Sequence, residues 1–176
     1  MDAKGQLGKI NPKIFTDSWK RKIPIFPQDF IVVCDTREQL PFFKSKTPKG
    51  LTIVRDTLKN GDYSVRGFED AICIERKKMS DLMSYIGSDR KNTIAKLLRL
   101  GTYEFKALVV EEDWDNLFLP KMFSQVTSES VRGFLKSLNV RFDVHFFCHP
   151  NREEVEWYIL DRLLYFFEKK REGIKL

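Results

Sequence analysis

Short, uninterrupted apolar runs constrain the fold of this chain more than any other feature, because they require a sheet that is covered on both faces. Residues 30–35 (FIVVCD) and 105–111 (FKALVVE) lack the alternation of a half-exposed strand, as expected for strands buried on both sides. We predict further strands at residues 51–55, 62–66, 71–77 and 140–147, and helices at 80–100, 127–138 and 151–170. Because strands interleave with helices throughout, the sequence predicts an α/β fold with a central mixed sheet flanked by helices.

The 176 residues allow one domain of ordinary size, preceded by a basic arm. Residues 1–28 hold three prolines and six basic side chains with weak periodicity, so we predict a loosely ordered arm and a domain over residues 29–176. The chain has 31 basic and 25 acidic residues, a formal charge of +6 that favours an anionic partner such as nucleic acid. The arm is either a contact for that partner or a solvated tail.

The sequence also argues against several other classes of protein. No apolar run approaches the ~20 residues of a membrane helix, so no membrane association is expected. Cys34, Cys73 and Cys148 are odd in number and far apart, which predicts neither a disulfide framework nor a structural zinc site. Cys148 stands beside His145 and His149, but alternation along a strand points neighbours to opposite faces, which disfavours a metal cluster. We expect an intracellular, reducing compartment, without distinguishing a nucleus, a prokaryotic cytoplasm or a virus-infected cell.

Two carboxylates and a lysine are predicted to meet on one hairpin. The strands at 62–66 and 71–77 are separated by a turn centred near Phe68 and Glu69, which pairs Asp62 with Glu75. Lys77 follows Glu75 by two residues and therefore points to the same side of the sheet. The other side of the hairpin is apolar and suited to a core: Tyr63, Val65, Ile72 and Ile74.

This predicted cluster suits the hydrolysis of a phosphodiester. Two carboxylates can hold Mg²⁺ at the edge of a sheet, and the metal can activate water and neutralise charge that develops on phosphorus. Lys77 could orient the attacking water or stabilise the same charge. The alternative is a surface hairpin whose charges form weak ion pairs, each worth about 0–1 kcal/mol.

Three stretches, IVVCDTREQLPF (31–42), GDYSV (61–65) and IERKKMSDL (74–82), closely resemble the nuclease domain of the XPF family of structure-specific endonucleases. The family signature is Gly-Asp, a variable spacer, Glu-Arg-Lys, three residues and Asp. Here those positions are Gly61, Asp62, Glu75, Arg76, Lys77 and Asp81. The resemblance covers about residues 30–165 and implies a restriction-endonuclease-like fold.

The resemblance also implies roles for individual residues. Asp62 and Glu75 would be metal ligands and Lys77 the catalytic lysine, while Asp35 and Glu38 would lie beside the metal as a further ligand or a water-positioning pair. Supporting positions would be Arg37, Arg76, Asp81 and Arg90, of which the first three fit a structural ion-pair network nearly as well. Candidate DNA contacts are Lys20, Arg21, Lys22, Lys78 and Lys91. Where the family often carries a Gln four residues after the Arg, this chain has Ile94.

The implied function is a Mg²⁺- or Mn²⁺-dependent endonuclease that acts on branched or flapped duplex DNA. Alternatives are a non-catalytic DNA-binding scaffold subunit of a nuclease complex and a sequence-specific, restriction-like nuclease. Family members usually carry a tandem helix-hairpin-helix module after the nuclease domain, and residues 1–176 leave no room for one. Unless residues 1–176 are part of a longer chain, a DNA-binding partner with that module or another, a second copy or the basic arm is therefore expected to supply specificity for branched DNA.

The final predicted helix bears on assembly. Asn151 followed by Glu154 is a plausible cap for its first turn. Its apolar residues occupy more than the ~100° stripe that one core-facing surface requires. The excess predicts a homodimer interface, which would resemble how the family's nuclease domains pair. The alternative is a helix buried within its own domain.

Overall fold

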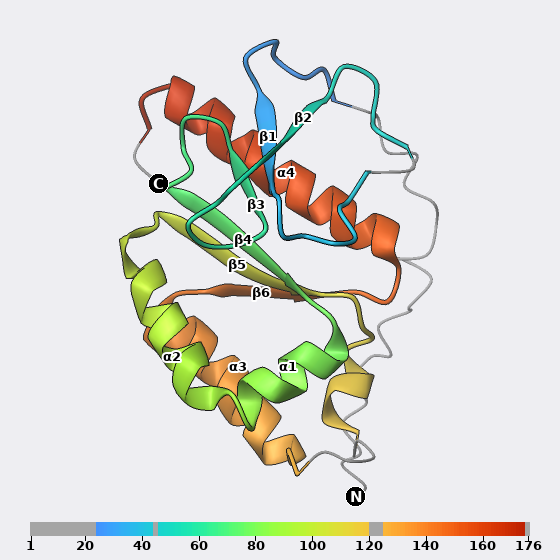
Figure 1. Ribbon diagram of the computed structural model, residues 1–176, viewed down its shortest axis with the longest axis vertical. Helices are drawn as coiled ribbons and strands as arrows, with labels where there is room; N and C mark the ends of the chain where they lie inside the picture. The colour runs from blue at the N-terminus through green and yellow to red at the C-terminus, as the bar shows by residue number, and fades with distance from the viewer. Residues whose placement is uncertain (1–23, 44–45, 120–124, 175–176) are drawn as a thin grey trace, which may run out of the picture.

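A mixed six-stranded sheet divides the molecule into two layers (Figure 1). The computed structural model describes residues 24–43, 46–119 and 125–174. The strands run in the spatial order β2-β1-β3-β4-β5-β6. Their bounds are Ile31–Asp35 (β1), Thr52–Asp56 (β2), Tyr63–Val65 (β3), Ile72–Lys77 (β4), Phe105–Val110 (β5) and His145–Cys148 (β6). β3 is antiparallel to both of its neighbours and every other pair is parallel, which confirms the predicted α/β class.

Helices cover both faces of this sheet. The helix α4 (Arg152–Arg171) lies on one face, whereas α1 (Met79–Ile86), α2 (Arg90–Arg99) and α3 (Ser128–Phe142) lie on the other (Figure 1). Single turns of tighter helix follow at Leu100–Thr102 and Asp115–Phe118. Each face has its own apolar core, as expected where strands are buried on both sides. In the described ranges, no helix combines the length and the apolarity that crossing a membrane demands.

Alternation along β4 assigns its side chains to the two layers. Ile72 and Ile74 belong to the core beneath α4, and Cys73 belongs to the core beneath α1, α2 and α3. Glu75 continues the side of Cys73, while Arg76 continues the side of Ile74. Glu75 and Arg76, which are adjacent in the family signature, therefore lie on opposite faces of the sheet.

The predicted strand at residues 140–147 is wrong in its first half. The helix α3 continues to Phe142, because Leu138 and Phe142 lie one turn apart and are both buried against the sheet. Asp143 then adopts a left-handed conformation with φ of 52°, and the Val144 amide donates to the Leu138 carbonyl at 2.8 Å. These two features end the helix, so β6 begins only at His145.

The end of the predicted arm already belongs to the domain. Phe26 is buried and stacks on Phe30 with ring centroids 6.0 Å apart. The core of the domain therefore includes Phe26, which the prediction placed in the arm. The basic residues Lys20, Arg21 and Lys22 lie outside the described residues, and a role for the arm stays a prediction.

The apolar stripe of α4 is largely covered by its own domain. The predicted cap is present, since the Asn151 side chain accepts from the Glu153 amide at 2.8 Å. Seven of the helix's apolar residues are buried: Val155, Ile159, Leu160, Leu163, Leu164, Phe166 and Phe167. Burial within the domain thus accounts for most of the stripe, and homodimer formation stays a prediction.

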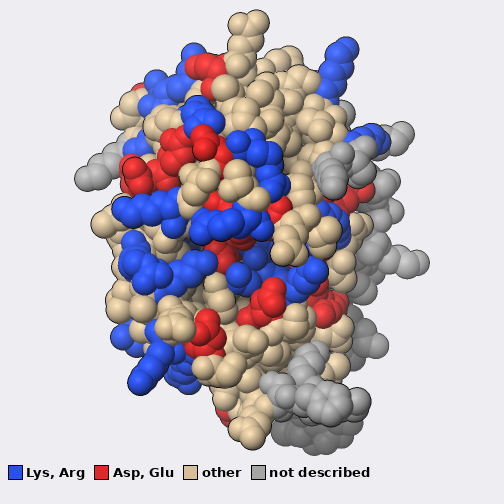
Figure 2. Space-filling model, viewed as in Figure 1, with Lys and Arg blue, Asp and Glu red and all other residues tan. Residues whose placement is uncertain are grey.

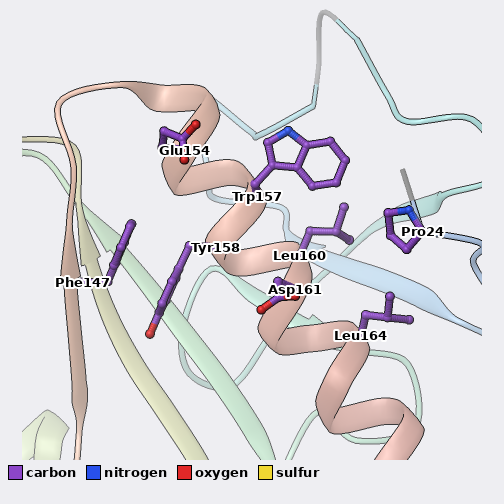
Figure 3. A pocket seen from close by; sticks show the side chains of 8 residues that line it. All are labelled: Pro24, Phe147, Glu154, Trp157, Tyr158, Leu160, Asp161 and Leu164. Carbon is purple, nitrogen blue, oxygen red and sulfur yellow. The ribbon is translucent and has the colours of Figure 1, made fainter. Parts of the chain in front are cut away.

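A hollow of about 500 Å³ remains along α4 beside β6 (Figure 3). Its wall includes Tyr158, which stacks in parallel on Phe147 of β6 with ring centroids 4.0 Å apart. Pro24 and Trp157 line it as well, with the acidic side chains Glu154 and Asp161. The hollow lies on the α4 side of the sheet, on the layer opposite Glu75.

Candidate active site

The β3–β4 hairpin pairs in the predicted register. Tyr63 lies opposite Ile74, so Asp62 and Glu75 are the next pair toward the open end of the hairpin. The Asp62 amide donates to the Ile74 carbonyl at 2.9 Å, and the Arg76 amide donates to Asp62 Oδ2 at 2.7 Å. These two backbone contacts hold the Asp62 carboxylate against β4.

Gly61 makes this close approach sterically feasible. Its φ is +76°, in the left-handed region that glycine tolerates and side chains with a Cβ avoid. A Cβ at this position would lie 2.5 Å from Cys73 Sγ and 3.1 Å from the Ile74 carbonyl oxygen. Only glycine fits here without a shift, which gives a physical reason for the Gly-Asp pair.

Three donors from three elements meet on one oxygen of Glu75. Lys77 Nζ of β4 and Lys96 Nζ of α2 each lie 2.7 Å from Glu75 Oε1. The Tyr85 hydroxyl of α1 donates to the same oxygen at 3.0 Å. The Glu75 side chain is only 8% exposed, so these contacts form largely away from water.

The two carboxyl groups of the pair have different electrostatic environments. Burial, and then the charge of Glu75, raise the pKa of Asp62 to about 7. Burial would also raise the pKa of Glu75, but Lys96 and Lys77 hold it below the ordinary value. Of these two carboxyl groups, Asp62 is therefore the one whose negative charge is less compensated by the protein.

This donor set fits a hard divalent cation. Mg²⁺ is commonly held by one or two carboxylates, with substrate phosphate and water completing the coordination. A cation beside Asp62 would also relieve the repulsion that raises the pKa of this group. In the described part of the chain, no group of three or more His, Cys, Asp or Glu side chains is arranged to hold a metal. The candidate metal site therefore consists of two carboxylates, Asp62 and Glu75.

Asp35, the third predicted ligand, is fully engaged by other donors. Asp35 Oδ1 accepts from the Arg37 amide at 2.8 Å and from Arg37 Nε at 2.7 Å. Asp35 Oδ2 accepts from Arg37 Nη2 at 2.9 Å and from the Leu58 amide at 2.8 Å. The side-chain bonds from Arg37 lower the pKa of this carboxyl to about 2. The buried Asp35 carboxylate thus forms an ion pair with the exposed Arg37, and metal ligation by Asp35 stays a prediction.

Glu38 and Arg76 belong to an ion-pair network at the start of α4. Arg76 Nη1 lies 3.3 Å from Glu38 Oε1, and Arg76 Nε donates to Glu111. Arg152 joins the network through Nη1, 3.2 Å from Glu111 Oε1. The Arg76 side chain is 5% exposed, and its guanidinium lies 5.1 Å from the centre of the Phe42 ring. These contacts give Glu38 and Arg76 a structural role, and a direct catalytic role for Glu38 stays a prediction.

The other predicted residues lie at the surface of α1 and α2. Asp81 is exposed in the first turn of α1, where it accepts from Ser80 Oγ at 3.5 Å. Lys78 is exposed immediately before α1, and Arg90 and Lys91 are exposed at the start of α2. The described contacts of Glu75 include none of these side chains, so their supporting and DNA-binding roles stay predictions.

Sequence reasoning missed Tyr85 and Lys96. Both lie on helix faces that pack toward the sheet: Tyr85 follows the buried Leu82 by three residues, and Lys96 lies between the buried Thr93 and Leu97. A polar side chain on such a face needs a buried partner, because unpaired burial is costly. This positional signal in the sequence could have marked both residues as partners of a buried acid.

A mixed sheet with helices on both faces, and an acidic pair beside a lysine on its central hairpin, defines a restriction-endonuclease-like domain. The ERCC4 domain model matches residues 34–160, so the chain belongs to the ERCC4 domain family. The resemblance to the XPF family of nucleases is thereby confirmed. No curated protein matches the sequence.

Solved structures have the same fold. XPF from Aeropyrum pernix, in complex with DNA, has a TM-score of 0.59 and 21% identity, over 80% of this chain and 66% of that one. Another structure of XPF from Aeropyrum pernix has a TM-score of 0.54 and 21% identity, over 75% of this chain and 61% of that one. The present chain therefore spans slightly less than two thirds of these solved chains.

Proposed function

We propose that this chain is a Mg²⁺- or Mn²⁺-dependent DNA endonuclease. The observation that carries the proposal is the convergence of Asp62, Glu75 and Lys77 on one side of the β3–β4 hairpin. Scaffold subunits of such nucleases have no need of a metal site. The presence of both carboxylates and the lysine therefore favours an enzyme over a scaffold.

Asp62 and Glu75 would hold the divalent ion, which when bound activates water and neutralises charge on the phosphate. Lys77 would act from beside Glu75, where its ammonium lies 2.7 Å from Oε1. From there it would orient the attacking water or donate to the phosphate oxygen on which charge develops. The three side chains are no more than partly exposed, which strengthens electrostatic contacts to a phosphate.

The charge distribution and one relative support DNA as the substrate. Lys and Arg side chains gather across the middle of the face in Figure 2, with acidic side chains among them. The formal charge of +6 acts in the same direction. The solved XPF from Aeropyrum pernix, which has a similar fold, is in complex with DNA.

We further propose branched or flapped duplex DNA, such as intermediates of repair, recombination or replication. This chain spans slightly less than two thirds of the solved XPF chains, and we propose that elements outside the nuclease fold contribute to junction recognition. A helix-hairpin-helix or other DNA-binding partner, a second copy of this chain or the N-terminal arm would supply it.

The decisive experiment is cleavage of labelled flap, fork, linear duplex and single-stranded DNA in Mg²⁺, Mn²⁺ or EDTA. We expect metal-dependent cutting of the branched substrates. Asp62→Asn should lower the cleavage rate on the order of a hundredfold to a thousandfold, because it removes a metal ligand. It should largely spare DNA affinity, which phosphate contacts of Lys and Arg supply.

The matched control is Asp70→Asn, at the exposed tip of the same hairpin, which should cut like the wild type. Normal cutting by Asp62→Asn would show that the proposed site is wrong. Tight DNA binding without cutting in any metal would favour the scaffold alternative. Cleavage of unbranched duplex at one defined sequence would instead favour a restriction-like nuclease.

A further inference from the structure

Lys96 brings a second ammonium group to the candidate metal site. Its Nζ lies 2.7 Å from Glu75 Oε1, the same distance as Nζ of Lys77 from the same oxygen. The family signature includes Lys77 and leaves Lys96 unassigned. This second cation therefore needs an explanation of its own.

The fold holds Lys96 firmly in this position. Thr93 and Leu97, its neighbours on the inner face of α2, are buried, and the Lys96 side chain is 27% exposed. Lys96 Nζ also lies 3.2 Å from the Tyr85 hydroxyl, which itself donates to Glu75 Oε1 at 3.0 Å. Lys96, Tyr85 and Glu75 thus form a closed triangle of contacts that links α1 and α2 to β4.

Lys96 changes the charge balance of the site. Asp62 and Glu75 carry two negative charges when ionised, and Lys77 alone would neutralise only one of them. With Lys96 the ammonium groups equal the carboxylates in number, and both ammonium groups lie on Glu75. A divalent ion on these carboxylates must then share Glu75 with two ammonium groups and overcome their repulsion.

We infer that Lys96 is a positioning residue that holds Glu75 Oε1 in the metal-free protein and lowers the affinity of the site for a divalent cation. The inference rests on the proposed function, because it takes Asp62 and Glu75 as the metal ligands. The site is thereby kept assembled without an ion, and the ion has to displace or share the contact from Lys96. Lys96 thus sets the divalent-ion concentration at which the site loads.

The test is Mn²⁺ binding to the metal-free protein in the absence of DNA, with free Mn²⁺ measured by electron paramagnetic resonance. Lys96→Met removes the charge and should tighten Mn²⁺ binding about tenfold. Lys96→Arg keeps the charge and should bind Mn²⁺ like the wild type. The matched control is Lys136→Met on α3, an exposed lysine that should leave Mn²⁺ affinity unchanged.

Thermal unfolding gives a second, independent readout. Without metal, Lys96→Met should melt below the wild type, because Glu75 loses a buried partner. Saturating Mn²⁺ should raise its melting temperature by more than it raises that of the wild type. A residue that merely supported the fold would lower stability and Mn²⁺ affinity together.

Unchanged or weaker Mn²⁺ binding by folded Lys96→Met would overturn the inference. If this variant does not fold, Lys96→Gln, which keeps a hydrogen-bond donor without the charge, answers the same question. Asp62→Asn separates the two proposals. Equal Mn²⁺ binding by the wild type and Asp62→Asn would overturn the metal site itself, whereas loss of binding in Asp62→Asn with no gain in Lys96→Met would overturn only the role of Lys96.

Discussion

Two aspartates at adjoining ends of the neighbouring strands β1 and β3 have opposite electrostatic environments. Asp35 ends β1 and Asp62 immediately precedes β3, and the Asp35 amide donates to the Asp62 carbonyl at 2.9 Å. The Asp35 carboxylate accepts four hydrogen bonds from Arg37 and Leu58, and its pKa is about 2. The Asp62 carboxylate accepts a hydrogen bond from the Arg76 amide and faces Glu75, and its pKa is about 7.

This difference shows two effects of a buried carboxylate. One whose charge is paired within the protein stabilises the fold, whereas one whose charge would be paired only by a ligand lowers the stability of the ligand-free protein. Asp35 is a carboxylate whose partners are all supplied by its own domain. Asp62 is buried beside a second carboxylate, so the protein alone does not balance its charge. Substitutions at these two positions should therefore have opposite effects on stability.

The largest effect on stability is expected when Asp62 is pushed away from β4. Gly61→Ala combines left-handed backbone strain of about 1–2 kcal/mol with a clash of about 1–3 kcal/mol against Cys73 and Ile74. We expect a lower free energy of unfolding, measured by urea denaturation, and slower DNA cleavage. Gly67→Ala isolates the strain, because its φ is +85° and nothing lies within 4 Å of its Cβ. Equal losses in the two variants would contradict the close packing of Gly61.

A smaller loss is expected for Asp35→Asn. Removing the charge weakens its bonds from Arg37 and Leu58, which should lower the free energy of unfolding by about 2 kcal/mol. The control is Asp56→Asn, its neighbour on β2, whose pair with Arg66 is exposed and therefore contributes little to stability. If metal-free wild type and metal-free Asp35→Asn unfold at the same urea concentration, the structural role of Asp35 is refuted.

Asp62→Asn should shift stability in the opposite direction. A carboxyl whose pKa rises on folding, here from 3.8 to about 7, stabilises the folded protein fully at low pH. That contribution is lost as the pH rises from about 4 to about 7. The free energy of unfolding of metal-free Asp62→Asn should therefore increasingly exceed that of the metal-free wild type as the pH rises through this range, with the largest difference at neutral pH. A pH-independent difference between the two proteins would show that the pKa of Asp62 is not raised.

The β3–β4 hairpin was predictable because local rules determine it. Alternation places Tyr63 and Ile74 on the apolar side, and the turn near Phe68 then pairs Asp62 with Glu75. Strand alternation and turn position act over a few residues, so the sequence contains all the information needed. The buried runs at β1 and β5 were predictable for a similar reason, since continuous apolar strands require cover on both faces.

Features that depend on tertiary contacts were less accessible. The extension of α3 to Phe142 arises from packing of Leu138 and Phe142 on the sheet, which local patterning did not reveal. Lys96 meets Glu75 from 21 residues away, because α2 packs against the sheet on the side of Glu75. Asp35 was identified by its motif, but its pairing with Arg37 and Leu58 depends on how β1 and the segment after β2 lie together.

The number of residues at the tip of the β3–β4 hairpin can change without moving Asp62 and Glu75, which are paired at its open end. Arg66 and Gly67 are exposed at the tip, and a Cβ on Gly67 would meet no atom within 4 Å. Strand pairing, rather than the number of residues in the turn, keeps Asp62 opposite Glu75. Evolution can therefore lengthen or shorten the spacer between the Gly-Asp and Glu-Arg-Lys motifs, and a sequence pattern that fixes this spacing would overlook true relatives.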